Sequence, residues 1–136
     1  VRMERHCANA LKVAQWLSAD PRVSWVSFPG LEGDKYHALA EKYMPNGTCG
    51  VISFGVPGGR EKVSAFLDHL KMVSIATHVA DARSCTLYPA GTTHRQLTEE
   101  QLIEAGVGID LVRLSCGIEN ADDIIADLDQ ALAAVQ

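Results

Sequence analysis

Polar and apolar residues alternate along two short segments of the 136-residue sequence. In residues 111–116 the even positions are apolar, whereas the odd positions include Arg113 and Ser115. Because successive side chains of a strand point to opposite faces, such a strand has one apolar side and one polar side. Residues 84–88 alternate in the same way. The pattern predicts an α+β fold: a mostly antiparallel sheet with helices packed on one face.

Apolar residues at a spacing of three or four predict the helices of that fold. Long helices are expected at residues 3–17, 60–70 and 120–132, with shorter helical segments at 35–43 and 98–105. The last of these segments opens with Thr98 and Gln101, which have the spacing of a capping box. Further strands are expected at residues 23–28, 50–56 and 75–79, each next to a Pro, Gly or Asp turn.

The first helix has no residue before it that could cap its free N–H groups, because the chain opens directly with Val1. A helix without a cap usually continues upstream. We therefore expect a fragment of a longer protein, with residues 1–136 forming a single domain of ordinary size.

Composition excludes several classes of protein. The net charge is −5 and the basic residues are scattered, so we expect no nucleic-acid partner. No apolar run approaches the roughly 20 residues that span a bilayer, so we expect no membrane segment. The cysteines form no C-x-x-C pair and indicate neither a disulfide framework nor a zinc motif, which favours a reducing cytoplasm; they are Cys7, Cys49, Cys85 and Cys116.

Few residues offer recognisable chemistry. The five histidines include no pair at i, i+4, so no metal site is predicted, and Gly58-Gly59 lacks the spacing of a phosphate-binding loop. No G-x-S-x-G motif is present. Arg113 stands out because it lies on the polar side of its strand, where a guanidinium suits the capture of a carboxylate through two hydrogen bonds. The alternative for Arg113 is a surface or ion-paired arginine.

Several motifs together resemble a known family. Residues 112–119 (VRLSCGIE) resemble a segment near the end of the Cys/Met-metabolism family of pyridoxal-phosphate (PLP) enzymes. Residues 89–94 (PAGTTH) and the helix at 122–128 are similar to the neighbouring stretches of that family. Residues 2–6 and 81–84 resemble its O-acetylhomoserine sulfhydrylase branch. The resemblance covers essentially the whole chain and keeps the motifs in order.

The resemblance implies that residues 1–136 are the small C-terminal domain of a fold-type I PLP enzyme and that residues 1–19 are the helix between its domains. The large PLP-binding domain would be absent. No lysine here has the S-x-T-K context of the cofactor lysine, so the fragment should contain no catalytic and no cofactor-binding residue, hold no PLP and be inert by itself. Loss of the large domain should also expose apolar residues of the first helix, for which Met3, Ala10 and Val13 are candidates.

The resemblance further implies a reaction: a PLP-dependent replacement that makes homocysteine, for methionine biosynthesis, from O-acetyl-L-homoserine and sulfide. Arg113, His78 and Thr93 would bind the amino-acid substrate, and the full-length enzyme would be a homotetramer. His78-Val79-Ala80 departs from the Ser-Leu-Gly or Asn-Val-Gly of relatives, which leaves the substrate open. The alternatives are a cystathionine γ-synthase or γ-lyase of the same family, or a stand-alone binding module without catalysis.

Overall fold

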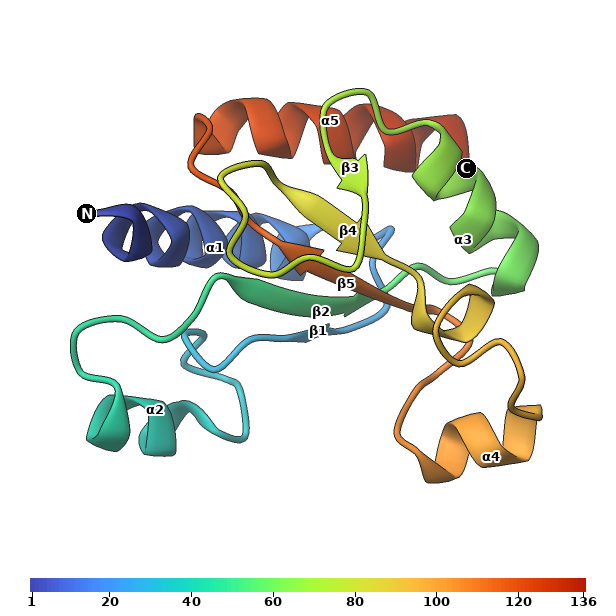
Figure 1. The fold of residues 1–136 in the computed structure, drawn as a ribbon, viewed down its shortest axis with the longest axis horizontal. Coiled ribbons are helices and arrows are strands. Elements are labelled where there is room, and N and C mark those ends of the chain that lie inside the picture. Colours follow the sequence, from blue (N-terminus) through green and yellow to red (C-terminus); the bar gives the residue numbers. More distant parts are fainter.

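The computed structural model describes all 136 residues and consists of one mixed sheet with helices around it (Figure 1). The helices are α1 (Arg2–Ala19), α2 (His37–Tyr43), α3 (Gly59–Asp68), α4 (Glu99–Glu104) and α5 (Ala121–Ala134), with a 3₁₀ turn η1 (Pro89–Gly91). The strands are β1 (Val26–Ser27), β2 (Val51–Gly55), β3 (Ser74–Ile75), β4 (Cys85–Leu87) and β5 (Leu111–Ser115).

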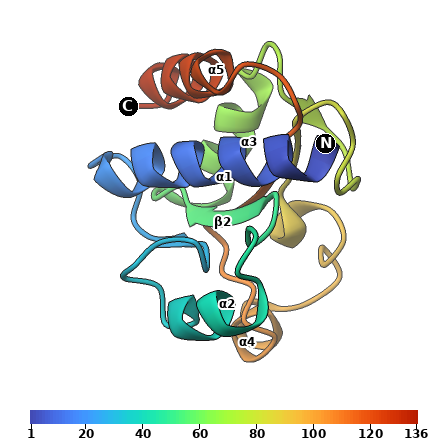
Figure 2. The ribbon, with the colours of Figure 1, turned by 90° about the vertical axis from the view of Figure 1, so that its left-hand side faces the viewer.

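The sheet has the order β1-β2-β5-β4-β3. Three of its four pairings are antiparallel and only β3 runs parallel to its neighbour β4, which confirms the prediction of a mostly antiparallel sheet. The long helices α1, α3 and α5 all cover one face (Figures 1 and 2). The short helices α2 and α4 lie on the other side, away from the strands and towards opposite ends (Figure 1). We call the sheet face between them the open face.

The core lies between the sheet and the three long helices and comprises 22 buried residues. Ile52 and Phe54 of β2 and Val112 and Leu114 of β5 point into it, as alternation predicts. Phe66 of α3 meets Phe54 edge to face, with ring centroids 6.1 Å apart. Because successive side chains of a strand alternate, Arg113 points to the other side of β5 and lies on the open face.

Helix α1 buries Ala10, Ala14 and Leu17, as their spacing predicts, and also residues that the spacing did not indicate. Its N-cap, Val1, makes no side-chain hydrogen bond, as predicted, but Ala10 and Val13 are fully buried, so the prediction that they lie bare is wrong. Met3 is 53% exposed, as expected. The polar residues His6 and Asn9 are buried as well: His6 Nδ1 lies 2.6 Å from the Cys116 carbonyl, and Asn9 Nδ2 donates to the carbonyls of Gly117 and Glu119.

Two predicted strands are shorter than expected. Of residues 23–28 only Val26–Ser27 form a strand, although the backbone of Ser24 and Trp25 still hydrogen-bonds to Gly55 of β2. Of residues 75–79, Ile75 ends the strand, and the chain then leaves the sheet as loop 77–84. The capping box at Thr98 is confirmed: both of its reciprocal hydrogen bonds are present.

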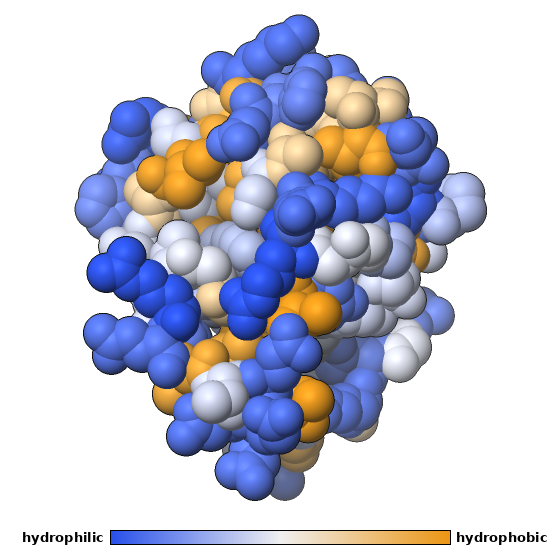
Figure 3. All heavy atoms as spheres, turned by 90° about the vertical axis from the view of Figure 1, so that its right-hand side faces the viewer, coloured by the Kyte–Doolittle hydropathy of each residue, from blue (hydrophilic) through white to orange (hydrophobic).

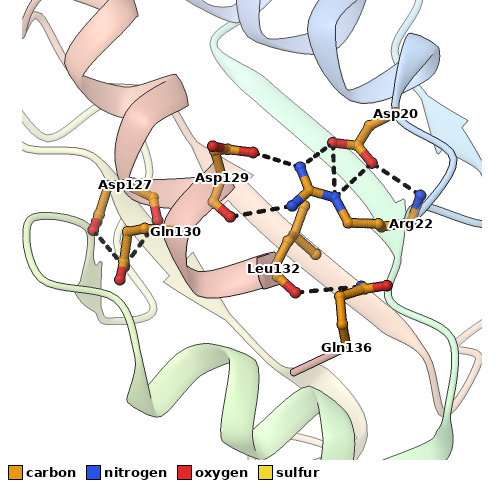
Figure 4. A network of polar contacts seen from close by, with 7 residues as sticks. All are labelled: Asp20, Arg22, Asp127, Asp129, Gln130, Leu132 and Gln136. Atoms are coloured by element: carbon orange, nitrogen blue, oxygen red, sulfur yellow. Dashed lines mark hydrogen bonds and ion pairs between the residues drawn. The ribbon is translucent and has the colours of Figure 1, made fainter. Parts of the chain in front are cut away.

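Polar anchors join the helical layer to the connecting segments (Figure 4). Arg22 hydrogen-bonds Asp20 at the end of α1 and Asp129 on α5, and its hydrogen bond is the main cause of the lowered pKa of Asp20. The Asp127 carboxylate accepts three successive backbone N–H groups, those of residues 71–73, at 2.8–2.9 Å. These bonds fix the turn between α3 and β3 against α5.

Exposed apolar side chains are unevenly distributed. Several lie on α1 and α2 at one end of the molecule, including Met3, Leu11, Leu39 and Met44. At the other end, which carries α3 and α4, hydrophilic side chains predominate and the apolar ones form small separate patches (Figure 3). None of the helices combines the length and the apolar character that a membrane crossing requires.

Candidate functional site

Arg113 lies in the middle of β5 on the open face, where its cross-strand neighbours are Ser53 of β2 and Leu87 of β4. Its Nη2 donates a hydrogen bond to the Thr77 carbonyl at 2.9 Å. It belongs to none of the ion pairs of the chain, so the alternative of an ion-paired arginine is not what the structure shows. A guanidinium has five N–H donors. Most of those of Arg113 are therefore free to bind an anion.

Loop 77–84, which supplies the Thr77 carbonyl, is fastened to the end of β5. The Ala80 N–H donates to Ser115 Oγ (3.1 Å). Farther along, Ser84 donates both its backbone N–H (2.6 Å) and its hydroxyl (3.0 Å) to the Glu119 carboxylate, and its Oγ accepts the Gly117 N–H (2.9 Å). We call this set, Ser84, Gly117 and Glu119, the loop latch. The latch holds the loop beside Arg113 through bonds that alternation cannot reveal.

His78 follows Thr77 directly, so the fold brings it to the same loop that contacts Arg113. Its side chain is 63% exposed and its Nδ1 lies 3.6 Å from Asp81 Oδ2. The other oxygen of Asp81 accepts the Arg83 N–H at 3.0 Å, and this backbone hydrogen bond is the main cause of the lowered pKa of Asp81. The stretch around His78 therefore lies beside Arg113.

Thr93 is placed differently. It is exposed on the segment that follows η1, and its hydroxyl lies 2.8 Å from Nδ1 of its own neighbour His94. No hydrogen bond joins Thr93 to Arg113 or to loop 77–84. Of the three residues that the resemblance implies for substrate binding, the fold connects two, and the role of Thr93 stays a prediction.

The structure also reveals a cluster that sequence spacing did not indicate. The ligand atoms of His78, Asp81 and Cys85 all lie within 4.8 Å of one another. The sequence has no pair of histidines at i, i+4, whereas here a loop and the start of β4 bring three different residue types together. The irregular backbone of the loop, with Ala80 at φ 57°, is what makes this approach possible.

Hollows on the surface do not coincide with Arg113, which lines none of them. One of about 390 Å³ lies between α1 and α2. A smaller one of about 160 Å³ is lined by His6, Cys49, Val79 and Ser115, among others. The open face around Arg113 is therefore a single wall, which can hold one side of a ligand but does not enclose it.

The residues near Arg113 do not by themselves fit PLP, which PLP enzymes hold through a lysine. All five lysines lie elsewhere: Lys12 pairs with Asp122, Lys35 lies over Tyr36, Lys42 lies over Tyr43, Lys62 lies against Gly58, and Lys71 adjoins the Asp127 anchor. No lysine of this chain is therefore placed near Arg113 to hold the cofactor there.

The structure is thus a small α+β domain whose sheet is covered on one face by the long helices and carries Arg113 on the open face. The family model of Cys/Met metabolism PLP-dependent enzymes matches residues 1–133, and the chain belongs to this family. It is 48% identical, over 97% of its length, to an O-acetyl-L-homoserine sulfhydrylase of Leptospira meyeri and 49% identical to a homocysteine synthase of Schizosaccharomyces pombe.

A solved structure agrees with this assignment. The crystal structure of a candidate O-acetylhomoserine (thiol)-lyase from Campylobacter jejuni, which contains a pyridoxyl-lysine phosphate, matches 97% of this chain with a TM-score of 0.90 and 40% identity. The chain spans only 30% of the Leptospira protein, 31% of the fission-yeast protein and 31% of the Campylobacter chain. The similarity therefore concerns about a third of each of these proteins.

Proposed function

We propose that this chain is the C-terminal, substrate-carboxylate-binding domain of a longer PLP-dependent enzyme that makes homocysteine from O-acetyl-L-homoserine and sulfide. The names of the relatives support the reaction, and the observation that carries the role of this chain is the free guanidinium of Arg113 on the open face. A single-walled site is what we expect if the rest of the enzyme supplies the other wall, the lysine and the cofactor. By itself the chain would be inert.

In this reaction the Cγ–O bond of the substrate breaks, acetate leaves, and sulfide forms a Cγ–S bond. PLP would supply the electron sink for the loss of protons from the substrate. Arg113 would hold the α-carboxylate by two parallel charge-assisted hydrogen bonds, which fix the direction of the Cα–H bond. The Thr77 carbonyl, 2.9 Å from Nη2, holds one side of the guanidinium and leaves the rest of the fork for the substrate.

His78 and Thr93 would assist in substrate binding. His78 reaches the site through loop 77–84, and its exposed imidazole is larger than the small polar residue that the resemblance implies for this position. The same resemblance supports a homotetramer for the longer enzyme. Four free thiols in the chain favour a location in the reducing cytoplasm.

The test is Arg113→Ala in the longer enzyme, assayed with O-acetylhomoserine and sulfide. Hydrogen bonds to charged partners contribute on the order of 1.5–3 kcal/mol each. Loss of two such bonds should lower kcat/KM by at least about a hundredfold, since roughly 1.4 kcal/mol corresponds to tenfold. Arg113→Lys should recover only part of the activity, because a point charge cannot form the paired hydrogen bonds. The melting temperature should barely change, because Arg113 contributes nothing to the core.

Arg83→Ala is the matched control, because Arg83 is an exposed arginine on the adjoining loop with its Nε 3.7 Å from Asp81. We expect this variant to keep its activity. Near-normal activity of Arg113→Ala would mean that another residue anchors the carboxylate. Cysteine in place of sulfide tests the reaction itself: a clear preference for cysteine would make the enzyme a cystathionine γ-synthase instead.

A further inference from the structure

We propose that His78, Asp81 and Cys85 form a binding site for a zinc ion, with loop 77–84 and the start of β4 as its frame. Their ligand atoms, an imidazole nitrogen, a carboxylate oxygen and a thiol sulfur, lie within 4.8 Å of one another. Imidazole, thiolate and carboxylate are the three ligand types that zinc takes in proteins. Three protein ligands and one water complete its usual tetrahedral coordination.

Zinc binding would draw together ligand atoms that lie up to 4.8 Å apart. Ligand bonds of about 2.0–2.3 Å in a tetrahedron place the ligand atoms roughly 3.3–3.8 Å apart. His78 Nδ1 and Asp81 Oδ2 are already at 3.6 Å. The His78 side chain is 63% exposed, whereas Cys85 is buried at 1% exposure in β4. Closing the site would therefore move the exposed His78 side chain towards the buried thiol of Cys85.

The hydrogen bonds of the cluster leave ligand atoms available. Asp81 uses Oδ1 to accept the Arg83 N–H, so that Oδ2 remains for a metal. The Cys85 thiol makes one long contact, 3.5 Å, to the Arg83 carbonyl. Burial raises the pKa of Cys85, and the charges of Asp81 and Glu119 raise it further while Arg83 lowers it. A cation bound here would compensate the negative charges of the Cys85 thiolate and the Asp81 carboxylate.

Binding would release one proton: the Cys85 S–H bond breaks, the proton goes to solvent, and the sulfur electron pair forms the bond to zinc. The imidazole of His78 would bind in its neutral form through a ring nitrogen lone pair, and Asp81 as the carboxylate. The inference concerns this chain alone and does not depend on the proposed substrate role of Arg113. A His78 bound to zinc could not serve the substrate at the same time.

The experiment is a titration of the 136-residue chain, reduced and free of tags, with Zn²⁺ in competition with a chromophoric chelator. We expect one zinc per chain. Cys85→Ser and His78→Ala should each weaken binding by at least about tenfold, because even indirect contacts to a metal are worth 10–100-fold in affinity. Co²⁺ in place of Zn²⁺ should give a sulfur-to-metal charge-transfer band that disappears in Cys85→Ser.

Matched controls are Cys49→Ser, a half-buried thiol elsewhere, and His94→Ala, a histidine of another loop. Both should bind zinc as the parent chain does. Because Cys85 is buried, its replacement could unfold the chain, and circular dichroism shows whether it does. The exposed His78 then decides the matter: unchanged zinc affinity in a folded His78→Ala, or equal loss in the controls, would overturn the proposal.

Discussion

The two faces of the sheet are stabilised in different ways. The covered face is stabilised by apolar packing: Ile52, Phe54 and Leu114 are fully buried against α1, α3 and α5. The open face is organised by loop 77–84, whose position depends on hydrogen bonds such as those of the loop latch. Apolar packing is tolerant of exact geometry, whereas each hydrogen bond needs its own partner. The open face is thus ordered by hydrogen bonds of the loop and not by apolar packing. It can therefore present free donors such as Arg113.

Asp127 is an exception to this difference between the faces, because it is a polar side chain that forms hydrogen bonds on the covered side. It is 6% exposed and holds the N–H groups of residues 71–73. Asp127→Ala would leave these donors without a partner, and an unsatisfied buried donor costs about 1–3 kcal/mol. We expect the free energy of unfolding to fall by roughly 3 kcal/mol in urea denaturation, the largest stability effect predicted for this chain. Asp68→Ala, an exposed residue at the end of α3, should change it by at most about 0.5 kcal/mol.

The pH dependence of the free energy of unfolding tests whether the charge of Asp127 causes this effect. Burial alone would raise the pKa of Asp127, but the three backbone N–H groups and Gln130 outweigh it and lower the pKa below 3.8. A carboxyl with a lowered pKa in the folded state stabilises fully above its unfolded pKa and loses this effect as the pH falls through the folded pKa. The advantage of the parent chain over Asp127→Asn should therefore be full above about pH 5 and shrink as the pH falls below the ordinary pKa of 3.8 and through the lowered folded pKa. An advantage that is constant over this range would contradict the assigned role of the charge.

On the open face, Gly117→Ala tests whether the loop latch positions loop 77–84. A Cβ on Gly117 would lie 2.4 Å from the Ala82 carbonyl oxygen and 2.5 Å from the Ser84 nitrogen, both of them backbone atoms. The latch would have to open to make room, and overpacking of this kind costs typically 1–3 kcal/mol. We expect a loss of about 2 kcal/mol in the same assay, with faster amide exchange confined to loop 77–84.

Gly33→Ala serves as the control for that variant, since nothing lies within 4 Å of a Cβ there. Its stability should stay within about 0.5 kcal/mol of the parent chain. If Gly117→Ala is no less stable than Gly33→Ala, the latch is not what positions the loop.

The same contrast explains what the sequence could predict. On the covered face, periodicity located the helices and the inward residues of β5, because burial of apolar side chains follows a regular repeat. At α1 it was correct in part: Ala10, Ala14 and Leu17 are buried as their spacing predicts, but so are His6 and Asn9, which hydrogen-bond carbonyls more than 100 positions away. No local pattern contains such partners. The expectation that Val13 lies bare came from the interpretation of this helix as one between two domains, and it is wrong because Val13 is fully buried within this domain.

The candidate site likewise has one part that the sequence predicts and one part that it does not. Alternation placed Arg113 on the polar side of its strand, because that statement depends only on the period of a strand. The sequence also predicted a strand for residues 75–79. In the structure the strand ends at Ile75, the chain turns away from the sheet, and the Thr77 carbonyl accepts a hydrogen bond from Arg113. The approach of Asp81 to His78 and Cys85 follows from that turn. A site made by a loop is thus visible only after the long-range bonds of the loop are known.

The smallest expected effect tests the backbone of this loop. Ala80 has φ 57°, the left-handed region that an L-residue enters at a cost of about 1 kcal/mol, while its N–H donates to Ser115. Ala80→Gly removes that cost but adds freedom to the unfolded chain, which offsets part of the gain. We expect a net stabilisation of roughly 0.5 kcal/mol, seen as a higher urea midpoint with an unchanged slope. Ala82→Gly, two residues on and outside the left-handed region, should instead lose about 0.5 kcal/mol, because only the entropic effect remains. A loss of equal size in both variants would show that the turn at Ala80 stores no strain, and the loop would then be held beside Arg113 by hydrogen bonds alone, those of the loop latch and that of Ala80 to Ser115.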